Sequence, residues 1–366
     1  MSIFLLNEMI AMLFNKKRLN EAFDLMSRGI EEKVFPCAAT AVGDKNGVVA
    51  LKVEGLKGFY PHDTPLNITS LFDLASLTKV VATTPLLMVM IEKGLISIYD
   101  KVYEYLPSFR GRGKEAVTIF DLITHTSGLP AYIPLYKVCK DYEDSIDYIC
   151  REVQLKKPGY VEYSDLGFIL LGKILELVGN NTLDKLCHQY IFEPLEMKNT
   201  CFNPLKGDVV PTEKNMETGE FLCGVCHDEN ARFFGGISGH AGLFSCILDL
   251  IKFADMLVNC GKTKAGRFIS LPLFRRMIMD YTGGKSGECR GWGWCVKGNS
   301  SAGCDLFSEK AFGHTGFTGT SIWVDPVYGI YIILLTNRVH LGRENNKIVR
   351  FRRLFMNMIM ASLIGR

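Results

Sequence analysis

Strand-like stretches lie near the two ends of this 366-residue sequence, and helical patterns fill its middle. Residues 37–42 and 48–53 are rich in β-forming residues and flank the Asp-Lys-Asn-Gly stretch at 44–47, whose Asn-Gly pair predicts a β-hairpin. A second β-rich pair, 316–324 and 330–336, predicts a hairpin near the C-terminus. Strands that meet from both ends of a chain favour one mainly antiparallel sheet with a helical segment inserted between them.

Apolar residues recur at helical spacing in six segments. The helices that we expect cover residues 16–33, 76–94, 144–154, 166–178, 246–259 and 346–364. Pro85 lies inside the second of them and is expected to kink it. The fold class is therefore α+β, an antiparallel sheet flanked by terminal helices plus an inserted, mainly helical domain. We place the discontinuous sheet domain at 1–75 and 245–366 and the helical domain at 76–244, with the functional site in the cleft between them.

Charge and hydropathy argue against two classes of protein. The net charge is only +3, and acidic and basic residues are mixed along the chain, which argues against a nucleic-acid partner. No stretch reaches the roughly 20 apolar residues of a spanning helix, so we expect no spanning membrane segment. The apolar segment at 351–364 follows three arginines and is expected to pack on the fold, although contact with a membrane surface is the alternative.

Cysteine usage and the N-terminus indicate a cytoplasmic protein. The twelve cysteines are scattered and lie mostly in apolar contexts, as expected for free thiols in a reducing compartment. The apolar stretch at 1–14 is interrupted by Glu8 and followed by the basic residues 16–18, which is the reverse of a signal peptide. The oligomeric state is left open.

Ser76-Leu77-Thr78-Lys79 is the first candidate for chemistry. Residues three apart share a helix face, so the Ser76 hydroxyl and the Lys79 amine can meet. A hydroxyl becomes a good nucleophile only when a base takes its proton, and an amine can do that or assist another group. A Ser-x-x-Lys tetrad also arises by chance, so it needs further support.

Two further segments supply partners. Tyr163-Ser164-Asp165 lies between a turn and a helical run, and a phenol near a lysine ionises more easily. The segment 312–319, Phe-Gly-His-Thr-Gly-Phe-Thr-Gly, lets a backbone approach a ligand closely because of its glycines. An anchoring tyrosine and an ordinary Gly-rich turn remain the alternatives.

In this order, Ser-x-x-Lys, Tyr-Ser-Asp and His-Thr-Gly resemble the serine β-lactamase and penicillin-binding protein superfamily. Within it the chain is similar to class C β-lactamases, D-alanyl-D-alanine carboxypeptidases and related esterases. The segments 121–130 and 235–244 also resemble stretches of this family, and the resemblance covers about residues 20 to 362. It implies a β-lactamase/transpeptidase-like fold and a serine hydrolase that acts on a small-molecule substrate without metal or cofactor.

The resemblance also implies roles. Ser76 would be acylated, Lys79 would assist its deprotonation, and Tyr163 would be the general base for acylation and for activating water. The backbone N–H groups of Ser76 and Phe317 would form the oxyanion hole. Asp165, His314, Thr315, Gly316 and Phe317 would contact the substrate.

Two of these residues depart from the usual family pattern. Asp165 stands where relatives carry Asn, and a carboxylate cannot donate to a substrate carbonyl. His314 stands where class C β-lactamases carry Lys, and a neutral imidazole holds a carboxylate less firmly. We therefore expect small esters, amides or D-amino-acid peptides as substrates and slow β-lactam hydrolysis. A penicillin-recognising sensor or scaffold with slow or no turnover is the alternative.

Three other patterns point to different chemistry. Cys223, Cys226 and His227 have the spacing of haem attachment or a redox pair. His227, Asp228 and Glu229 with His240 contain zinc-ligand residue types, but their spacing is not that of a recognised zinc site. Trp292 and Trp294 fit either an aromatic wall of the cleft or a core anchor. For the zinc-type pattern we expect satisfied polar loop residues. Haem attachment at the Cys223–Cys226 loop needs export, for which we see no signal.

Overall fold

The computed structural model describes residues 3–6, 13–59, 61–204, 207–216, 218–284, 287–298 and 302–364. Most of the N-terminal apolar stretch that was compared with a signal peptide lies outside the described residues. Within them the strands are β1 Ile3–Leu6, β2 Cys37–Asp44, β3 Gly47–Gly55, β4 Phe72–Asp73, β5 Cys201–Phe202, β6 Leu243–Ser245, β7 Lys262–Thr263, β8 Gly266–Arg267, β9 Cys295–Val296, β10 Phe312–Thr315, β11 Ser321–Asp325 and β12 Ile330–Thr336.

Helices of three kinds connect these strands. The α-helices are α1 Lys16–Glu31, α2 Thr84–Glu92, α3 Val102–Tyr105, α4 Ile119–Ile123, α5 Leu135–Val138, α6 Tyr142–Arg151, α7 Asp165–Gly179, α8 Leu183–Cys187, α9 Glu229–Phe233, α10 Ile247–Val258, α11 Leu271–Met277 and α12 Lys347–Ala361. The short 3₁₀- and π-helices are η2 Ala75–Leu77, η3 Lys79–Thr83, η4 Lys114–Ala116, η5 His188–Phe192 and η6 Arg338–Leu341.

The main sheet joins the two ends of the sequence. Its seven strands have the order β1-β3-β2-β12-β11-β10-β9, and every neighbouring pair is antiparallel. β12 pairs with β2 from Ile330 opposite Asp44 to Thr336 opposite Ala38, so the C-terminal hairpin completes the N-terminal one. The predicted antiparallel sheet is therefore confirmed.

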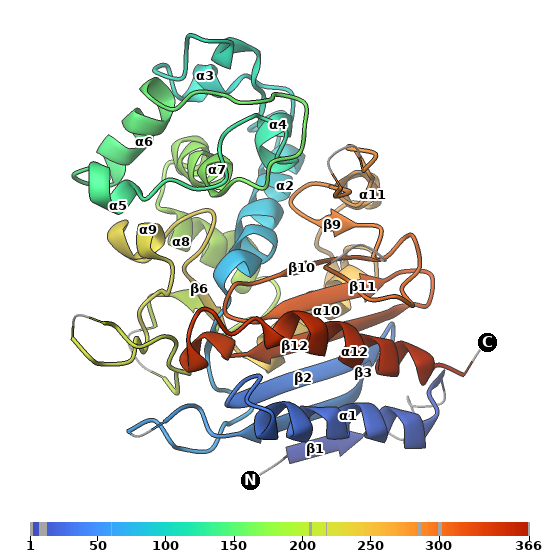
Figure 1. Ribbon diagram of the computed structural model, residues 1–366. Coiled ribbons are helices and arrows are strands. Elements are labelled where there is room, and N and C mark those ends of the chain that lie inside the picture. Colours follow the sequence, from blue (N-terminus) through green and yellow to red (C-terminus); the bar gives the residue numbers. More distant parts are fainter. Residues whose placement is uncertain are drawn as a thin grey trace.

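Helices cover both faces of this sheet. α1 and α12 lie side by side on one face, where Phe23 meets Phe355 and Phe35 meets Phe351 (Figure 1). α10 packs against β2, β11 and β12 on the other face, whose core continues into the helical middle of the chain. The terminal helices and the inserted helical segment were both predicted, and both are present.

A small sheet lies where the helical middle joins the main sheet. β6 pairs with β4 on one side and with β5 on the other, so residues 72–73, 201–202 and 243–245 meet there. The domain boundaries expected at 75/76 and 244/245 lie close to β4 and β6. These boundaries stay a prediction.

Local details differ from the sequence prediction in three places. The segment expected as one helix over 76–94 is η2, η3 and α2 in succession, and Pro85 lies in the first turn of α2, where a missing N–H costs nothing. The strand expected over 316–324 begins only at Ser321, because residues 316–320 form a turn. β10 precedes that turn, and the residue pattern alone did not indicate it, although the family resemblance implied a strand at Thr315 and Gly316.

The segment 75–92 is also long and apolar enough to cross a membrane by length and composition. However, 78% of this stretch is buried inside the fold, as in a core helix of a globular protein. A bent pair, 165–179 with 183–192, passes the same test only as a joined span.

Candidate active site

Ser76 lies in η2, directly after a strained backbone position. Ala75 adopts φ +47°, a left-handed conformation that is unfavourable for residues with a Cβ. The Asp73 side chain holds this turn, because its Oδ1 accepts the Ala75 N–H at 2.8 Å. Strain of this kind is retained where the surrounding structure fixes it, and here it sets the position of the Ser76 hydroxyl.

Lys79 begins η3, and its ammonium group contacts three oxygen atoms. Lys79 Nζ donates to Ser76 Oγ at 3.1 Å and to the His240 carbonyl oxygen at 3.0 Å. It also forms an ion pair with Asp165 Oδ1 at 2.7 Å, and the Lys79 side chain is fully buried. Burial alone would lower the pKa of Lys79, but Asp165 and Tyr163 outweigh it and raise this pKa. Lys79 is therefore an ammonium at neutral pH.

Tyr163 lies beside this ammonium, just before α7. Lys79 Nζ is 4.9 Å from the centre of the Tyr163 ring, and the Tyr163 Oη atom is buried close to Lys79 and Ser76. Burial raises the pKa of the phenol, although Lys79 opposes this shift. The phenol is thus protonated at rest, and the nearby positive charge eases its ionisation.

Two histidines flank Tyr163, with ring centroids 4.6 Å away for His125 and 5.8 Å away for His314. His125 Nδ1 accepts the Ser164 N–H at 3.0 Å, so a neutral His125 carries its proton on Nε2. His314 Nδ1 contacts the Thr315 carbonyl oxygen at 2.9 Å, so it is the protonated nitrogen and Nε2 has the free lone pair. Burial, followed by nearby positive charges, holds the pKa of both imidazoles well below the ordinary value.

The turn between β10 and β11 is fastened next to η2. Thr320 Oγ1 donates to the Leu74 carbonyl oxygen at 3.1 Å, and a Cβ on Gly316 would collide with that same oxygen. Glycine at 316 is therefore required by this close approach. Thr315 ends β10, and Phe317 projects from the turn with 49% of its surface exposed.

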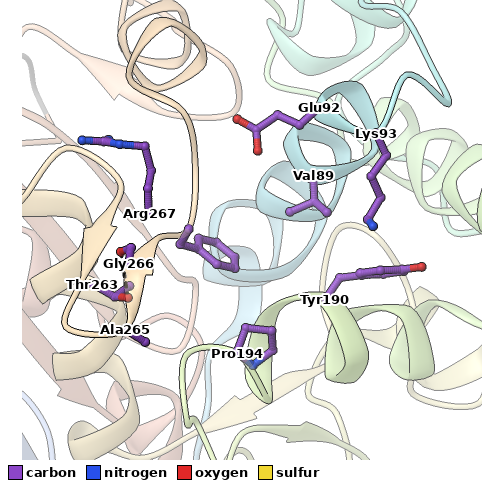
Figure 2. Close-up of a pocket in the computed structure, with 10 residues that line it drawn as sticks. Val89, Glu92, Lys93, Tyr190, Pro194, Thr263, Ala265, Gly266 and Arg267 are labelled. Atoms are coloured by element: carbon purple, nitrogen blue, oxygen red, sulfur yellow. Dashed lines mark hydrogen bonds between the residues drawn. The ribbon is translucent and has the colours of Figure 1, made fainter.

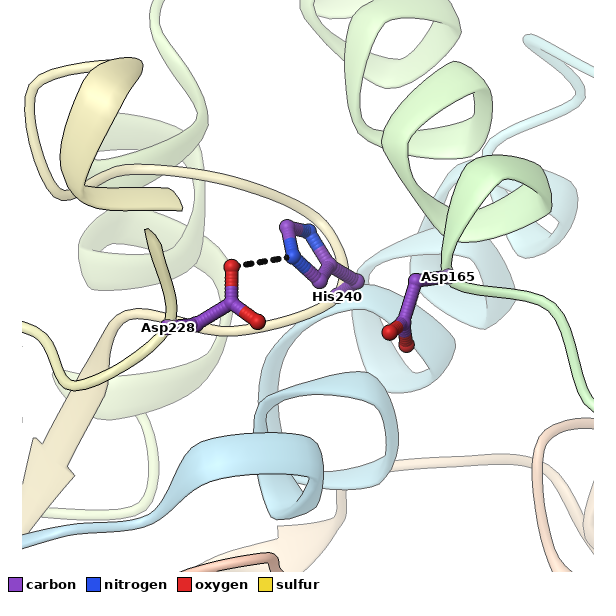
Figure 3. A group of neighbouring side chains, drawn as sticks. All are labelled: Asp165, Asp228 and His240. Atoms are coloured by element: carbon purple, nitrogen blue, oxygen red, sulfur yellow. Dashed lines mark hydrogen bonds and ion pairs between the residues drawn. The ribbon is translucent and has the colours of Figure 1, made fainter. Parts of the chain in front are cut away.

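Asp228 and His240 form a second polar group, joined to Lys79 through the His240 carbonyl oxygen. Figure 3 shows these two residues with Asp165. His240 Nε2 lies 2.9 Å from Asp228 Oδ1, and His240 Nδ1 lies 2.8 Å from Ser238 Oγ. One ligand atom from each of Asp165, Asp228 and His240 lies within 4.8 Å of the others, which is close enough to hold a metal ion. The Lys79 ammonium already pairs with Asp165, and this positive charge would repel a cation there.

The zinc pattern considered from the sequence is therefore only partly assembled. Asp228 and His240 meet, but the third member is Asp165, whereas His227 pairs with Glu213 at 2.9 Å. Cys223 is exposed and Cys226 is buried, and both are free thiols. Trp292 and Trp294 are 4% and 0% exposed, so the core anchor is the correct alternative for both.

The structure thus brings Ser76, Lys79, Tyr163 and Asp165 together, with His314 beside Tyr163. It places Thr315, Gly316 and Phe317 along the neighbouring strand and turn. Sequence reasoning missed Asp73, which fixes the turn before Ser76, and Arg290, whose guanidinium carbon lies 5.1 Å from the Tyr163 ring centre. Neither residue belongs to a motif, so only contacts in the folded chain reveal them.

A separate surface pocket of about 410 Å³ has no such chemistry (Figure 2). Val89 and Glu92 of α2 and Lys93 just after it line one side, Tyr190 lies next to Lys93, and Arg267 lies across from them. The Arg267 guanidinium is already bound to the carbonyl oxygens of two residues in its own loop. None of the candidate site residues lines this pocket.

Comparison with known proteins agrees with this geometry. The profile of the Beta-lactamase family matches residues 22–355. The chain is 31% identical to "N-acetylmuramyl-L-alanine amidase" of Bacillus subtilis (strain 168), covering 89% of this chain and 82% of that protein. It is 32% identical to "Putative D-alanyl-D-alanine carboxypeptidase" of Escherichia coli (strain K12), covering 89% of this chain and 84% of that protein.

Solved structures show the same fold at lower identity. A penicillin-binding protein homologue from Caulobacter crescentus superposes with a TM-score of 0.77 at 18% identity, covering 99% of this chain and 100% of that one. EstCE1, a hydrolase with promiscuous acyltransferase activity, superposes with a TM-score of 0.73 at 19% identity, covering 91% of this chain and 99% of that one. The predicted β-lactamase/transpeptidase-like fold is confirmed.

Proposed function

This chain belongs to the beta-lactamase family of serine hydrolases, and we propose that it hydrolyses small esters, amides or D-amino-acid peptides through an acyl-enzyme on Ser76. The contact of Lys79 Nζ with Ser76 Oγ at 3.1 Å, beside the Tyr163 ring, carries this proposal. It joins a nucleophile, a cation and a second proton carrier in one place, which is the arrangement that covalent catalysis needs.

The protonation state of Lys79 supports Tyr163 as the general base of the proposed mechanism. Lys79 is an ammonium whose three N–H groups all have oxygen partners, so it cannot accept the Ser76 proton. Tyr163 is protonated at rest and acts once it has lost this proton to solvent: its phenolate then takes the Ser76 proton while Ser76 Oγ bonds to the substrate carbonyl carbon. The carbonyl oxygen becomes an oxyanion, which the N–H groups of Ser76 and Phe317 stabilise.

Collapse of this intermediate breaks the bond to the leaving group, which receives the proton from Tyr163. The acyl group then remains on Ser76 Oγ. A water molecule repeats the sequence in the deacylation half: Tyr163 takes its proton, the new oxyanion forms, and Ser76 leaves with that proton. The step needs no metal and no cofactor.

The substrate is a small molecule, and amides and peptides of the cell-wall type fit best. Both curated relatives named above act, by their names, on amide bonds of that kind. Asp165 offers the substrate an acceptor in place of an amide donor, and His314 offers an uncharged Nε2. Both changes weaken recognition of β-lactams, whose carbonyl and carboxylate groups need donors.

We also propose a cytoplasmic location. All twelve cysteines are free, and Cys37, Cys150, Cys187, Cys226, Cys246, Cys295 and Cys304 are buried. Free buried thiols are the usual state in a reducing compartment.

The decisive experiment labels the nucleophile. The wild-type protein, Ser76→Ala and the control Ser97→Ala, which changes an exposed serine after α2, are incubated with a fluorescent penicillin and with p-nitrophenyl acetate. We expect intact-mass and peptide spectra to show an acyl adduct on Ser76 in the wild type and the control, and none in Ser76→Ala.

Turnover separates hydrolysis from binding alone. Release of p-nitrophenol beyond one equivalent, lost in Ser76→Ala and in Tyr163→Phe, supports the hydrolase. A stable adduct without turnover of any ester or amide favours the sensor or scaffold. Equal turnover by wild type and Ser76→Ala contradicts the mechanism.

A further inference from the structure

We propose that Arg290 is a positioning residue that supplies a second positive charge to Tyr163 and so favours its phenolate form. The inference rests on the proposed role of Tyr163 as general base. It concerns a residue outside every motif, in the loop between α11 and β9.

The geometry holds Arg290 firmly against the Tyr163 ring. The Arg290 guanidinium carbon lies 5.1 Å from the ring centre, within the range of a cation–π contact. Its Nε donates to Glu288 Oε2 at 2.9 Å, and its NH2 group contacts the same oxygen. The Arg290 N–H also donates to Thr282 Oγ1 at 2.9 Å, which fixes the backbone of this residue.

One end of the guanidinium is left without an acceptor. The NH1 group of Arg290 is buried and makes no hydrogen bond to any described residue, and only 3% of Arg290 is exposed. Tyr163 Oη is also buried, and Lys79 and Ser76 are the neighbouring groups that can hydrogen-bond to it. Unpaired buried donors are costly, so a neighbouring group that becomes an anion during the reaction relieves this cost.

The other ionisable groups around Tyr163 are paired or neutral, so they do not already supply the charge that is proposed for Arg290. Lys79 faces the ring but is paired with Asp165, which cancels much of its charge. His125 and His314 are neutral, because burial and the nearby cations hold the pKa of each imidazole low. Glu288 is the counter-ion of Arg290, and 40% of its side chain is exposed to water, which screens its charge. Arg290 is thus the cation near Tyr163 whose counter-ion is best screened.

The pH profile of kcat/KM tests the inference, because its ascending limb reports the ionisation of the coupled Lys79 and Tyr163 pair. Arg290→Gln is expected to move the midpoint of this limb up by about one pH unit, since an opposite charge at this distance shifts a pKa by roughly 1–3 units. Activity at pH 7 would fall about tenfold. Arg290→Lys, which keeps the charge, is expected to recover most of the shift.

Glu288→Gln is the matched control, because it breaks the same ion pair and leaves Arg290 with its charge uncompensated. We expect its midpoint to move in the opposite direction, down by about half a pH unit. A purely structural role of the Arg290–Glu288 pair would instead reduce activity in both variants without shifting the limb. Glu288 is more exposed than Arg290, with 40% of its side chain in solvent, so Glu288→Gln keeps the test usable if Arg290→Gln is poorly folded.

A second experiment moves the positive charge from position 290 to position 314 and measures the midpoint of the pH profile again. His314→Lys places an ammonium beside Tyr163, and in the Arg290→Gln background it is expected to bring the midpoint back down. Unchanged midpoints in both Arg290→Gln and Glu288→Gln, or shifts in the same direction, overturn the inference. If Tyr163→Phe itself keeps full activity, the proposed function fails as well, so the two failures are distinguishable.

Discussion

The ion pair between Lys79 and Asp165 gives the sharpest stability prediction. Lys79 is fully buried, and the Asp165 side chain is 19% exposed, with 2.7 Å between Nζ and Oδ1. Removing one partner of a buried pair costs about 3–5 kcal/mol because the other charge stays buried. An asparagine still offers Lys79 an amide oxygen, so Asp165→Asn is expected to lower the free energy of unfolding by about 3 kcal/mol.

The pH dependence of this effect follows from the sign of the shift. The pKa of Lys79 is raised in the folded state, so the pair stabilises the protein fully below the ordinary lysine value of 10.5. This stabilisation is lost as the pH rises through the folded-state pKa. Urea denaturation at pH 7 should therefore show the full difference in unfolding free energy between wild type and Asp165→Asn. This difference should become smaller in strong alkali.

Glu162→Gln is the control for this measurement. Glu162 pairs with Lys156 at 3.2 Å, and the two side chains are 32% and 61% exposed, so this surface pair contributes at most about 1 kcal/mol. Equal losses of unfolding free energy in Asp165→Asn and Glu162→Gln would refute the assigned strength of the buried pair.

The same variant tests substrate recognition. Asparagine restores an N–H donor at position 165, and one hydrogen bond to a substrate carbonyl is worth about 1 kcal/mol, or roughly fivefold in rate. Acylation of Ser76 by a fluorescent penicillin is therefore expected to rise in Asp165→Asn although the protein is less stable. No gain in the acylation rate would show that the missing donor is not the obstacle to β-lactams.

Three further predictions concern other parts of the chain. Gly239→Ala would place a Cβ against the Phe168 carbonyl oxygen and is expected to cost at least about 2 kcal/mol in unfolding free energy; a variant with unchanged urea midpoint would contradict this close packing. The hydrogen bond with His227 lowers the pKa of Glu213 to about 2, so the stabilisation by the Glu213 carboxylate exists above pH 4.5 and is lost as the pH falls toward 2. Thermal melts of wild type and Glu213→Gln should converge over that range, and parallel curves would refute it. In the native protein, iodoacetamide should modify the exposed Cys223 before the buried Cys226, and equal rates by mass spectrometry would disprove the difference in access.

Strong local patterns predicted most of the sheet and its covering helices. The Asn-Gly turn fixed the first hairpin to β2 and β3, and the apolar run at 330–336 has the same bounds as β12. α10 and α12 differ from their predicted ranges by one to three residues at each end. These elements were predictable because periodicity and turn chemistry act over a few residues.

Features that depend on distant contacts were not predictable. The sequence around Ser76 reads as one helix, yet Asp73 and the glycine-rich turn at 316–320 hold it as η2 followed by η3. The order of the motifs suggests that Asp165 lies near Lys79. The strength of this ion pair, however, depends on how deeply the two side chains are buried, which the sequence does not give. Asp228 and Arg290 reach the site from separate loops, so spacing along the chain carries no signal of their position.

The two departures from the family pattern make sense together when charges are followed in space. His314 removes a positive charge from the strand beside Tyr163, and Asp165 neutralises much of the charge on Lys79. A phenol in that setting would ionise less easily, since burial already raises its pKa. Arg290 supplies a cation from the loop before β9, the strand that pairs with β10, so this charge comes from a segment next to His314 and not from position 314 itself. Catalytic competence at such a site therefore depends on the sum of charges around the base, and a comparison of motifs position by position misses a charge that has moved to another segment.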